Sequence, residues 1–170
     1  MFNPLRLPML TLLWLGACFL VLNEFRRSTG AFLMGLLLFV IAATIVKLFV
    51  IDISSWGLTS QFVYGGDYQP VEALMRLIDF GAIILFLIVA WQGTKGVGKD
   101  FSVAKLLGSL ALAMLFIFTT LETNTFLYHY IPGLQAGGIS ILWTVFALSF
   151  LIYGIRNRVK ELRYVGLALF

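Results

Sequence analysis

The sequence predicts an all-α fold, a polytopic bundle of transmembrane helices, from its hydropathy, its low charge and the length of its apolar runs. Of the 170 residues, 61% are hydrophobic and 12% are charged, and the mean hydropathy is +0.98. A soluble domain carries roughly 25% charged residues, so water is not the main solvent of this chain. A bilayer core about 30 Å thick needs roughly 20 apolar residues per helix, which leaves room for about five complete spans and little else.

Five apolar runs have the length of a membrane span, and a sixth begins near the end of the chain. The runs are apolar on all sides and lack strict two-residue alternation, which favours helices over strands. We therefore expect a single transmembrane region over residues 1–170, without a soluble domain. The spans are predicted at residues 7–23, 31–51, 74–91, 104–121 and 137–155, and the sixth starts at 164–170.

Basic residues gather in alternate connectors between the spans. Nine of the 12 Lys and Arg residues lie there, and the positive-inside rule assigns these connectors to the cytoplasm. The N-terminus is then predicted on the outside of the membrane. Arg6 is weak evidence against this orientation. Because the charges form short groups rather than one basic helix face, the net charge of +4 does not predict a nucleic-acid partner. The nine residues are Arg26, Arg27, Lys95, Lys99, Lys105, Arg156, Arg158, Lys160 and Arg163.

The two longest connectors on the opposite side, residues 53–69 and 122–135, are rich in aromatic residues. Amphipathic rings favour the headgroup layer, so we expect both connectors to lie along the outer interface, in contact with membrane lipids. A binding role is possible there but is not required. The candidate interfacial residues are Trp56, Phe62, Tyr64, Tyr68, Tyr128 and Tyr130.

Five ionisable residues are predicted at one end of the second and third spans. Glu72, Arg76 and Asp79 are spaced four and three apart and share a helix face. Lys47 and Asp52 approach the same level, although five residues place them about 140° apart on a regular helix. Such a cluster serves either as an ion path, proton relay or substrate site, or as an ion-pair network that locks two helices together. Its position near the span ends favours the second interpretation.

Other patterns in the sequence do not predict a catalytic, cofactor or metal site. The segment Gly93–Asp100 matches half of a phosphate-binding loop, but Asp100 replaces the required hydroxyl and a transmembrane helix precedes it, so a basic turn is expected. Cys18 is the single cysteine and lies in the first span. His129 is the single histidine and is interpreted as a solvated loop residue.

An internal repeat with a period of four helices relates the first spans to the last ones. It predicts that the chain is a fragment and continues beyond Phe170, because the sixth run is too short to cross a bilayer. The matching residues are Leu13, Trp14, Leu22 and Arg27 with Leu142, Trp143, Leu151 and Arg156, and Gly35–Phe39 with Gly166–Phe170.

Four segments carry a resemblance to a known family. They are Lys47-Leu-Phe-Val-Ile-Asp52-Ile-Ser54, Arg76-Leu-Ile-Asp-Phe-Gly81, Ser140-Ile-Leu-Trp143 and Tyr153-Gly-Ile-Arg156. The chain resembles the C-terminal repeat region of a family of large, many-spanning bacterial membrane proteins of unknown function. The resemblance implies the fold, an inner-membrane location and a longer parent chain, and it implies no activity.

Three functions stay open at this point. The first is a non-enzymatic envelope scaffold, or a module that binds lipid or a protein partner through the aromatic connectors; the partner would be the rest of the parent chain or another membrane protein. The second is a transporter that uses the charge cluster. The third is a membrane-embedded enzyme acting on lipid-linked substrates, with an acid or base among Asp67, Asp79, Glu122 and His129.

Overall fold

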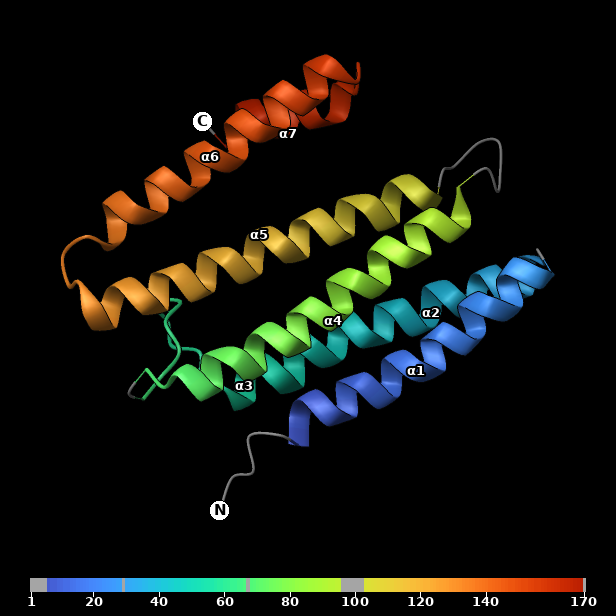
Figure 1. The fold of residues 1–170 in the computed structure, drawn as a ribbon, viewed down its shortest axis with the longest axis horizontal. Coiled ribbons are helices and arrows are strands. Elements are labelled where there is room, and N and C mark those ends of the chain that lie inside the picture. Colours follow the sequence, from blue (N-terminus) through green and yellow to red (C-terminus); the bar gives the residue numbers. More distant parts are fainter. Residues whose placement is uncertain (1–5, 29, 67, 96–102, 170) are drawn as a thin grey trace. The chain divides into compact units, whose positions relative to one another are not determined.

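The computed structural model describes residues 6–28, 30–66, 68–95 and 103–169 of the chain (Figure 1). Across these residues the fold is all-α, with one isolated β-bridge between Leu58 and Tyr64 and no strand. Within this described part of the chain, five helices are long and apolar enough to cross a membrane, as the sequence predicts. The chain is therefore a multi-pass integral membrane protein.

The spanning helices are longer than the apolar runs that predicted them. The second span is one continuous helix over residues 31–55, although its hydrogen-bonding pattern changes along its length. The elements are α1 (Arg6–Arg27), α2 (Ala31–Lys47), the π-helical turn η1 (Leu48–Asp52), α3 (Ile53–Ser55), α4 (Pro70–Thr94), α5 (Val103–Tyr130), α6 (Gln135–Arg156) and α7 (Lys160–Ala168).

The prediction of a long connector over residues 122–135 is wrong, because α5 continues to Tyr130. The polar residues there are accommodated by the helix. Thr125, for example, donates its hydroxyl hydrogen bond to the carbonyl of Leu121 at 2.8 Å. The helix-breaking pair Pro132-Gly133 lies just beyond its end. His129 is accordingly a half-buried helical residue, with Nδ1 2.9 Å from the carbonyl oxygen of Thr125, and not a solvated loop residue.

The chain forms two compact units, which are described separately. The first, here called unit 1, comprises residues 1–59 and 64–118 and contains α1 to α4 with the first part of α5. In it α1 packs against α2 and α4. Fully buried apolar side chains from these helices and α5 form its core, including Leu22, Leu37, Phe80, Ile83 and Leu107.

The second unit, unit 2, comprises residues 60–63 and 119–170. Its α6 and α7 form a closely packed hairpin. A Cβ atom at Gly166 would lie 2.9 Å from the carbonyl oxygen of Ala147, so the two backbones approach each other through a glycine. The helix α7 begins at Lys160, four residues before the predicted start of the sixth run.

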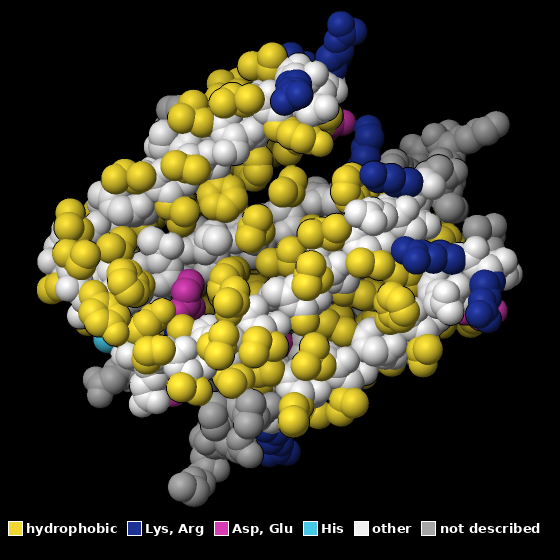
Figure 2. Space-filling model, in the orientation of Figure 1, with side chains coloured by type: hydrophobic (Ala, Val, Ile, Leu, Met, Phe, Trp, Pro, Cys, Tyr) yellow, Lys and Arg dark blue, Asp and Glu magenta, His cyan; other side chains and the backbone are white. Residues whose placement is uncertain are grey.

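The outward-facing side chains of the spanning helices are largely apolar. Leu13, Leu20 and Phe32 are 73%, 70% and 81% exposed. Figure 2 shows such hydrophobic side chains along the helices, with Lys and Arg side chains gathered toward the helix ends. An exposed apolar surface of this extent is expected where lipid, and not water, surrounds the helices.

Candidate functional site

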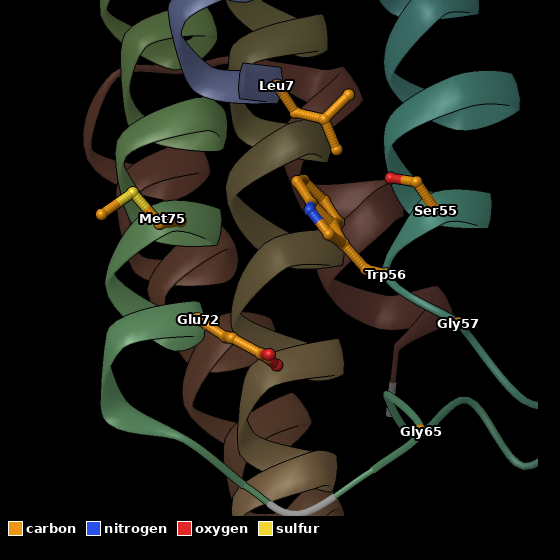
Figure 3. A pocket seen from close by; sticks show the side chains of 7 residues that line it. All are labelled: Leu7, Ser55, Trp56, Gly57, Gly65, Glu72 and Met75. Atoms are coloured by element: carbon orange, nitrogen blue, oxygen red, sulfur yellow. The ribbon is translucent and has the colours of Figure 1, made fainter. Parts of the chain in front are cut away.

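A pocket opens at the end of unit 1 where α1 and α4 begin and α3 finishes. Its volume is about 270 Å³. Figure 3 shows the carboxylate of Glu72 extending from α4 below the indole ring of Trp56, toward the side formed by two glycines. The lining residues are Leu7, Ser55, Trp56, Gly57, Gly65, Glu72 and Met75.

A π-helical turn lies next to this pocket. Over Leu48–Asp52 the helix widens, and the N–H of Ile53 donates to the carbonyl of Leu48, five residues earlier. Single π turns inside α-helices occur frequently at functional sites. In a π-helical turn the backbone hydrogen bonds join residues five positions apart, so side chains five positions apart lie on the same face of the helix. The expectation that Lys47 and Asp52 lie 140° apart is therefore wrong.

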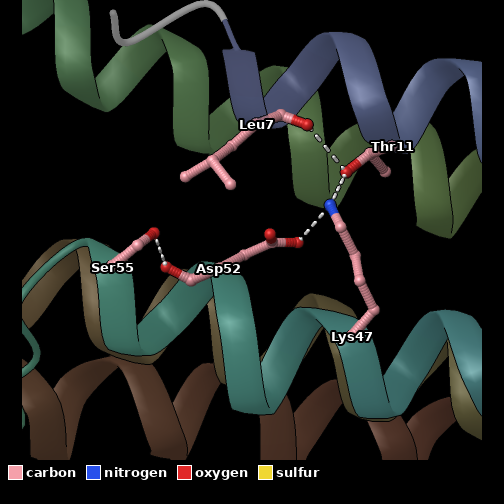
Figure 4. Close-up of polar contacts among 5 residues, drawn as sticks. All are labelled: Leu7, Thr11, Lys47, Asp52 and Ser55. Atoms are coloured by element: carbon pink, nitrogen blue, oxygen red, sulfur yellow. Dashed lines mark hydrogen bonds and ion pairs between the residues drawn. The ribbon is translucent and has the colours of Figure 1, made fainter. Parts of the chain in front are cut away.

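Lys47 connects α1 to the widened turn. Its Nζ donates a hydrogen bond to Oδ2 of Asp52 at 2.7 Å and another to Oγ1 of Thr11 (Figure 4). The Thr11 hydroxyl donates in turn to the carbonyl of Leu7, 3.2 Å away. Asp52 is 0% exposed and Thr11 1%. Lys47 is thus held by a carboxylate and a hydroxyl, both buried.

Thr11 is a member of the site that the sequence did not point out. A hydroxyl in an apolar run usually bonds only to its own helix, which gives no signal of a longer-range role. The one indication in the sequence is the position of Thr11, because it is a polar residue in the first span at the level of the charged residues.

Asp79 completes the buried group from α4. It is 0% exposed and interacts electrostatically with Thr11, Lys47 and Asp52. Neither of its carboxylate oxygens, nor Oδ1 of Asp52, is in hydrogen-bonding geometry with any described residue. Buried polar atoms are nearly always hydrogen-bonded, so three such oxygens in one place require an explanation.

Arg76 and Glu72 form the other half of the predicted cluster, one and two turns from Asp79 along α4. Arg76 Nη1 lies 3.9 Å from Glu72 Oε2. The guanidinium is 3% exposed and its Cζ lies 4.3 Å from the centroid of the Tyr64 ring. Tyr64 in turn meets Trp56 edge to face, with 6.0 Å between ring centroids. The five predicted residues therefore all lie in unit 1, as two neighbouring groups.

The candidate aromatic residues differ in exposure and are divided between the two units. Tyr64 is buried, Trp56 and Tyr68 are half-buried, and Phe62 is exposed with a positive φ of 57°. Tyr128 and Tyr130 are exposed on α5 in unit 2. Trp56 and Tyr64 thus belong to the packing around Arg76.

The remaining sequence candidates contribute little to this site. In the segment that resembles a phosphate-binding loop, the hydroxyl of Thr94 donates to the carbonyl of Ala90 at 2.9 Å, and residues 96–100 lie outside the described residues. Asp67 also lies outside them. Among the described residues no group of three His, Cys, Asp or Glu is arranged to hold a metal ion.

No known protein family, no curated protein and no solved structure matches the chain.

Proposed function

We propose that this integral membrane protein takes part in transport and that it binds one small cation, a proton or a monovalent metal ion, at the charge cluster of unit 1. The cluster consists of Lys47, Asp52, Glu72, Arg76 and Asp79. These carry two formal positive and three formal negative charges, a net charge of −1. The surplus charge belongs to the buried pair Asp52 and Asp79, because the single ammonium of Lys47 is hydrogen-bonded to Asp52 and acts on Asp79 only through its charge.

The uncompensated carboxylate is the observation that carries the proposal. Burying an unpaired charge is strongly unfavourable, so structural ion pairs in a protein interior are balanced and hydrogen-bonded. Here Asp79 is fully buried with both oxygens lacking a hydrogen-bond partner among the described residues. One added cation neutralises the group and uses those oxygens. Ionisable residues within membrane spans are commonly parts of ion pathways and proton relays.

Flux measurements in proteoliposomes test this proposal. Proton and Na⁺ flux are followed with a pH-sensitive and a Na⁺-sensitive dye enclosed in the vesicles. We expect Asp79→Asn to abolish cation flux and Asp79→Glu to restore part of it, while the protein stays folded. Glu24→Gln, at a side chain that is 57% exposed, is the matched control. Unchanged flux in Asp79→Asn, or no flux in the unaltered protein, overturns the proposal.

A second candidate function is a non-enzymatic envelope module that binds lipid or a protein partner. It is favoured by the exposed aromatic side chains near the end of α5 in unit 2. Their rings pack there at an interplanar angle of 36°, with 4.8 Å between ring centroids; the residues are Phe126 and Tyr130, which are 44% and 55% exposed. Native mass spectrometry of the purified protein tests it: a stoichiometric adduct that is lost in Tyr130→Ala supports this function, and a bare chain contradicts it.

The orientation and the wider context are further parts of the proposal. The basic helix ends around Arg26, Lys105 and Arg156 face the cytoplasm of a bacterium, and the N-terminus faces outside. In a Cys18→Ala background, a membrane-impermeant thiol reagent applied to intact cells is expected to label Ser60→Cys and not Ser28→Cys. The reverse pattern overturns the orientation.

A further inference from the structure

We infer that the pocket between α1, α3 and α4 binds a small ammonium group, which belongs either to a lipid headgroup or to a free small amine. This inference uses Glu72 and Trp56, and it does not depend on cation transport through Asp79. The pocket volume of about 270 Å³ is many times the roughly 10–15 Å³ that one buried water molecule requires. It therefore admits a headgroup-sized ligand.

The charge of the pocket selects a cation. Glu72 is the charged side chain among the lining residues, and its carboxylate extends along the pocket (Figure 3). Its ion pair with Arg76 is 3.9 Å long, compared with about 2.8 Å for a charge-assisted hydrogen bond. The Glu72 side chain is 48% exposed, whereas Arg76 is only 3% exposed. The carboxylate therefore keeps acceptor capacity for a ligand, and the guanidinium behind it offers little surface to an anion.

The aromatic lining favours an ammonium ion over a strongly hydrated metal ion. The indole of Trp56 lines the pocket beside the carboxylate and is held in place by Tyr64 and by Phe80, the latter with 6.1 Å between ring centroids. An indole face attracts ammonium groups through its π electrons. Leu7 adds apolar surface for the carbon atoms attached to the nitrogen.

Two glycines keep one side of the pocket free of side chains. Gly57 has a positive φ of 68°, and the N–H of Gly65 donates to its carbonyl at 3.0 Å. A Cβ atom on Gly65 would lie 3.1 Å from that same oxygen. A larger residue at Gly65 would therefore disturb the turn and narrow the opening that Glu72 faces.

The pocket is joined to the buried charge cluster by hydrogen bonds from two sides. Leu7, which lines the pocket, accepts from Thr11, and Ser55, which also lines it, donates to the backbone carbonyl of Asp52 at 2.7 Å (Figure 4). A ligand that displaces either lining residue therefore shifts a direct neighbour of Lys47.

Saturation-transfer NMR on the detergent-purified protein tests the inference, with ethanolammonium chloride as the probe and sodium acetate as the negative control. We expect binding of ethanolammonium that is weakened about tenfold in Glu72→Gln and in Trp56→Phe. Glu24→Gln is expected to bind like the unaltered protein. If Trp56→Phe does not fold, Glu72→Gln and Glu72→Lys decide alone, since this side chain is half exposed. No binding by the unaltered protein, or equal binding in Glu72→Gln, overturns the inference.

The source of the ammonium group is decided in nanodiscs made of phosphatidylethanolamine or of phosphatidylglycerol. If a lipid headgroup is the ligand, phosphatidylethanolamine competes with the ethanolammonium probe, and native mass spectrometry finds this lipid retained by the unaltered protein but not by Glu72→Gln. If a free amine is the ligand, the probe binds equally in both lipids. Asp79 does not line the pocket, so ethanolammonium binding that persists in Asp79→Asn, with or without cation flux, separates this pocket from the function proposed for Asp79.

Discussion

The Nζ atom of Lys47 lies 2.7 Å from Oδ2 of Asp52, although five residues separate them along one helix. A regular α-helix would set these residues about 140° apart. The π-helical turn over Leu48–Asp52 removes that separation, because the backbone bond from Ile53 to Leu48 spans five residues. The local widening of the helix thus creates the ion pair.

The origin of this pair predicts opposite effects of a deletion and an insertion. Removing Val50, which is 64% exposed, converts the π turn into an α turn and leaves Lys47 and Asp52 four apart, where they still share a face. We expect a fall of at most a few degrees in the thermal midpoint of the detergent-purified protein. Inserting an alanine after Val50 rotates the following turn by about 100° and separates the pair. A deletion as damaging as the insertion would contradict this account.

The charge balance of the cluster predicts an order of stability among variants in which one charged residue is replaced by an uncharged one. Lys47→Met leaves two buried carboxylates without their cation, and we expect it to lower the free energy of unfolding by about 3 kcal/mol or more. Asp52→Asn is milder, since Asp79 still neutralises the ammonium. Asp79→Asn is neutral or stabilising, because it removes the surplus charge. Chemical denaturation in detergent measures this order.

Arg27→Met is the control for those variants. The Arg27 side chain is 72% exposed and lies 3.9 Å from Glu24, and exposed ion pairs contribute about 0–1 kcal/mol. A large loss in Asp79→Asn, comparable to that of Lys47→Met, would mean that Asp79 is a structural ion-pair partner and would remove the basis for a cation site.

Hydropathy was sufficient to predict the fold, and spacing was sufficient for half of the site. The five spans are apolar over lengths that only a bilayer requires, so they were found without tertiary information. The ends of the helices could not be predicted from hydropathy, because polar residues such as Thr125 form hydrogen bonds within their own helix, and the helix continues through them. The grouping of Arg76 with Glu72 followed from helical spacing alone.

The other half of the site depends on features that local sequence does not encode. The segment Leu48–Asp52 contains no glycine or proline to announce a change of helix type. The hydrogen bond from Lys47 to Thr11 joins residues 36 positions apart, and only the packing of α1 on α2 brings them together. The packing of Tyr64 on Arg76 likewise turns an expected interfacial ring into a buried one.

The packing of the α6–α7 hairpin predicts that a Gly→Ala substitution changes stability at one position of the hairpin and not at another. Gly166→Ala places a methyl group 2.9 Å from the carbonyl oxygen of Ala147, so the helices must move apart. We expect a loss of about 1–3 kcal/mol and a longer α6–α7 distance, measured by spin labels at Leu148 and Leu167. Both label sites are exposed.

Gly137→Ala is the control for the hairpin. Among the described residues, no atom beyond the neighbouring backbone of α6 lies within 4 Å of a Cβ built at Gly137, and alanine is the better helix former by about 1 kcal/mol. This variant should be neutral or slightly more stable, with an unchanged α6–α7 distance. Equal effects at the two glycines would show that α6 and α7 do not pack through Gly166.

A fourth prediction concerns Asn124, which anchors the short segment of residues 60–63 within unit 2. Its Nδ2 donates to the carbonyls of Gln61 and Phe62 at 3.1 and 3.0 Å, and Asn124 is 7% exposed. Asn124→Leu keeps the volume and removes both donors, which leaves those carbonyls to find other partners. We expect amide hydrogen exchange in residues 60–63 to accelerate by about tenfold or more, with α6 and α7 unchanged.

Two further variants separate the loss of this anchor from general destabilisation. Thr123→Val alters the neighbouring, half-buried position on α5 and should leave exchange in the segment as it is. Phe62→Gly should slow exchange or leave it unchanged, because glycine adopts the positive φ of 57° at this position without strain. If Asn124→Leu leaves exchange in residues 60–63 unaffected, then the strained turn at Phe62 is held by the chain itself, and the two hydrogen bonds from α5 contribute nothing measurable to it.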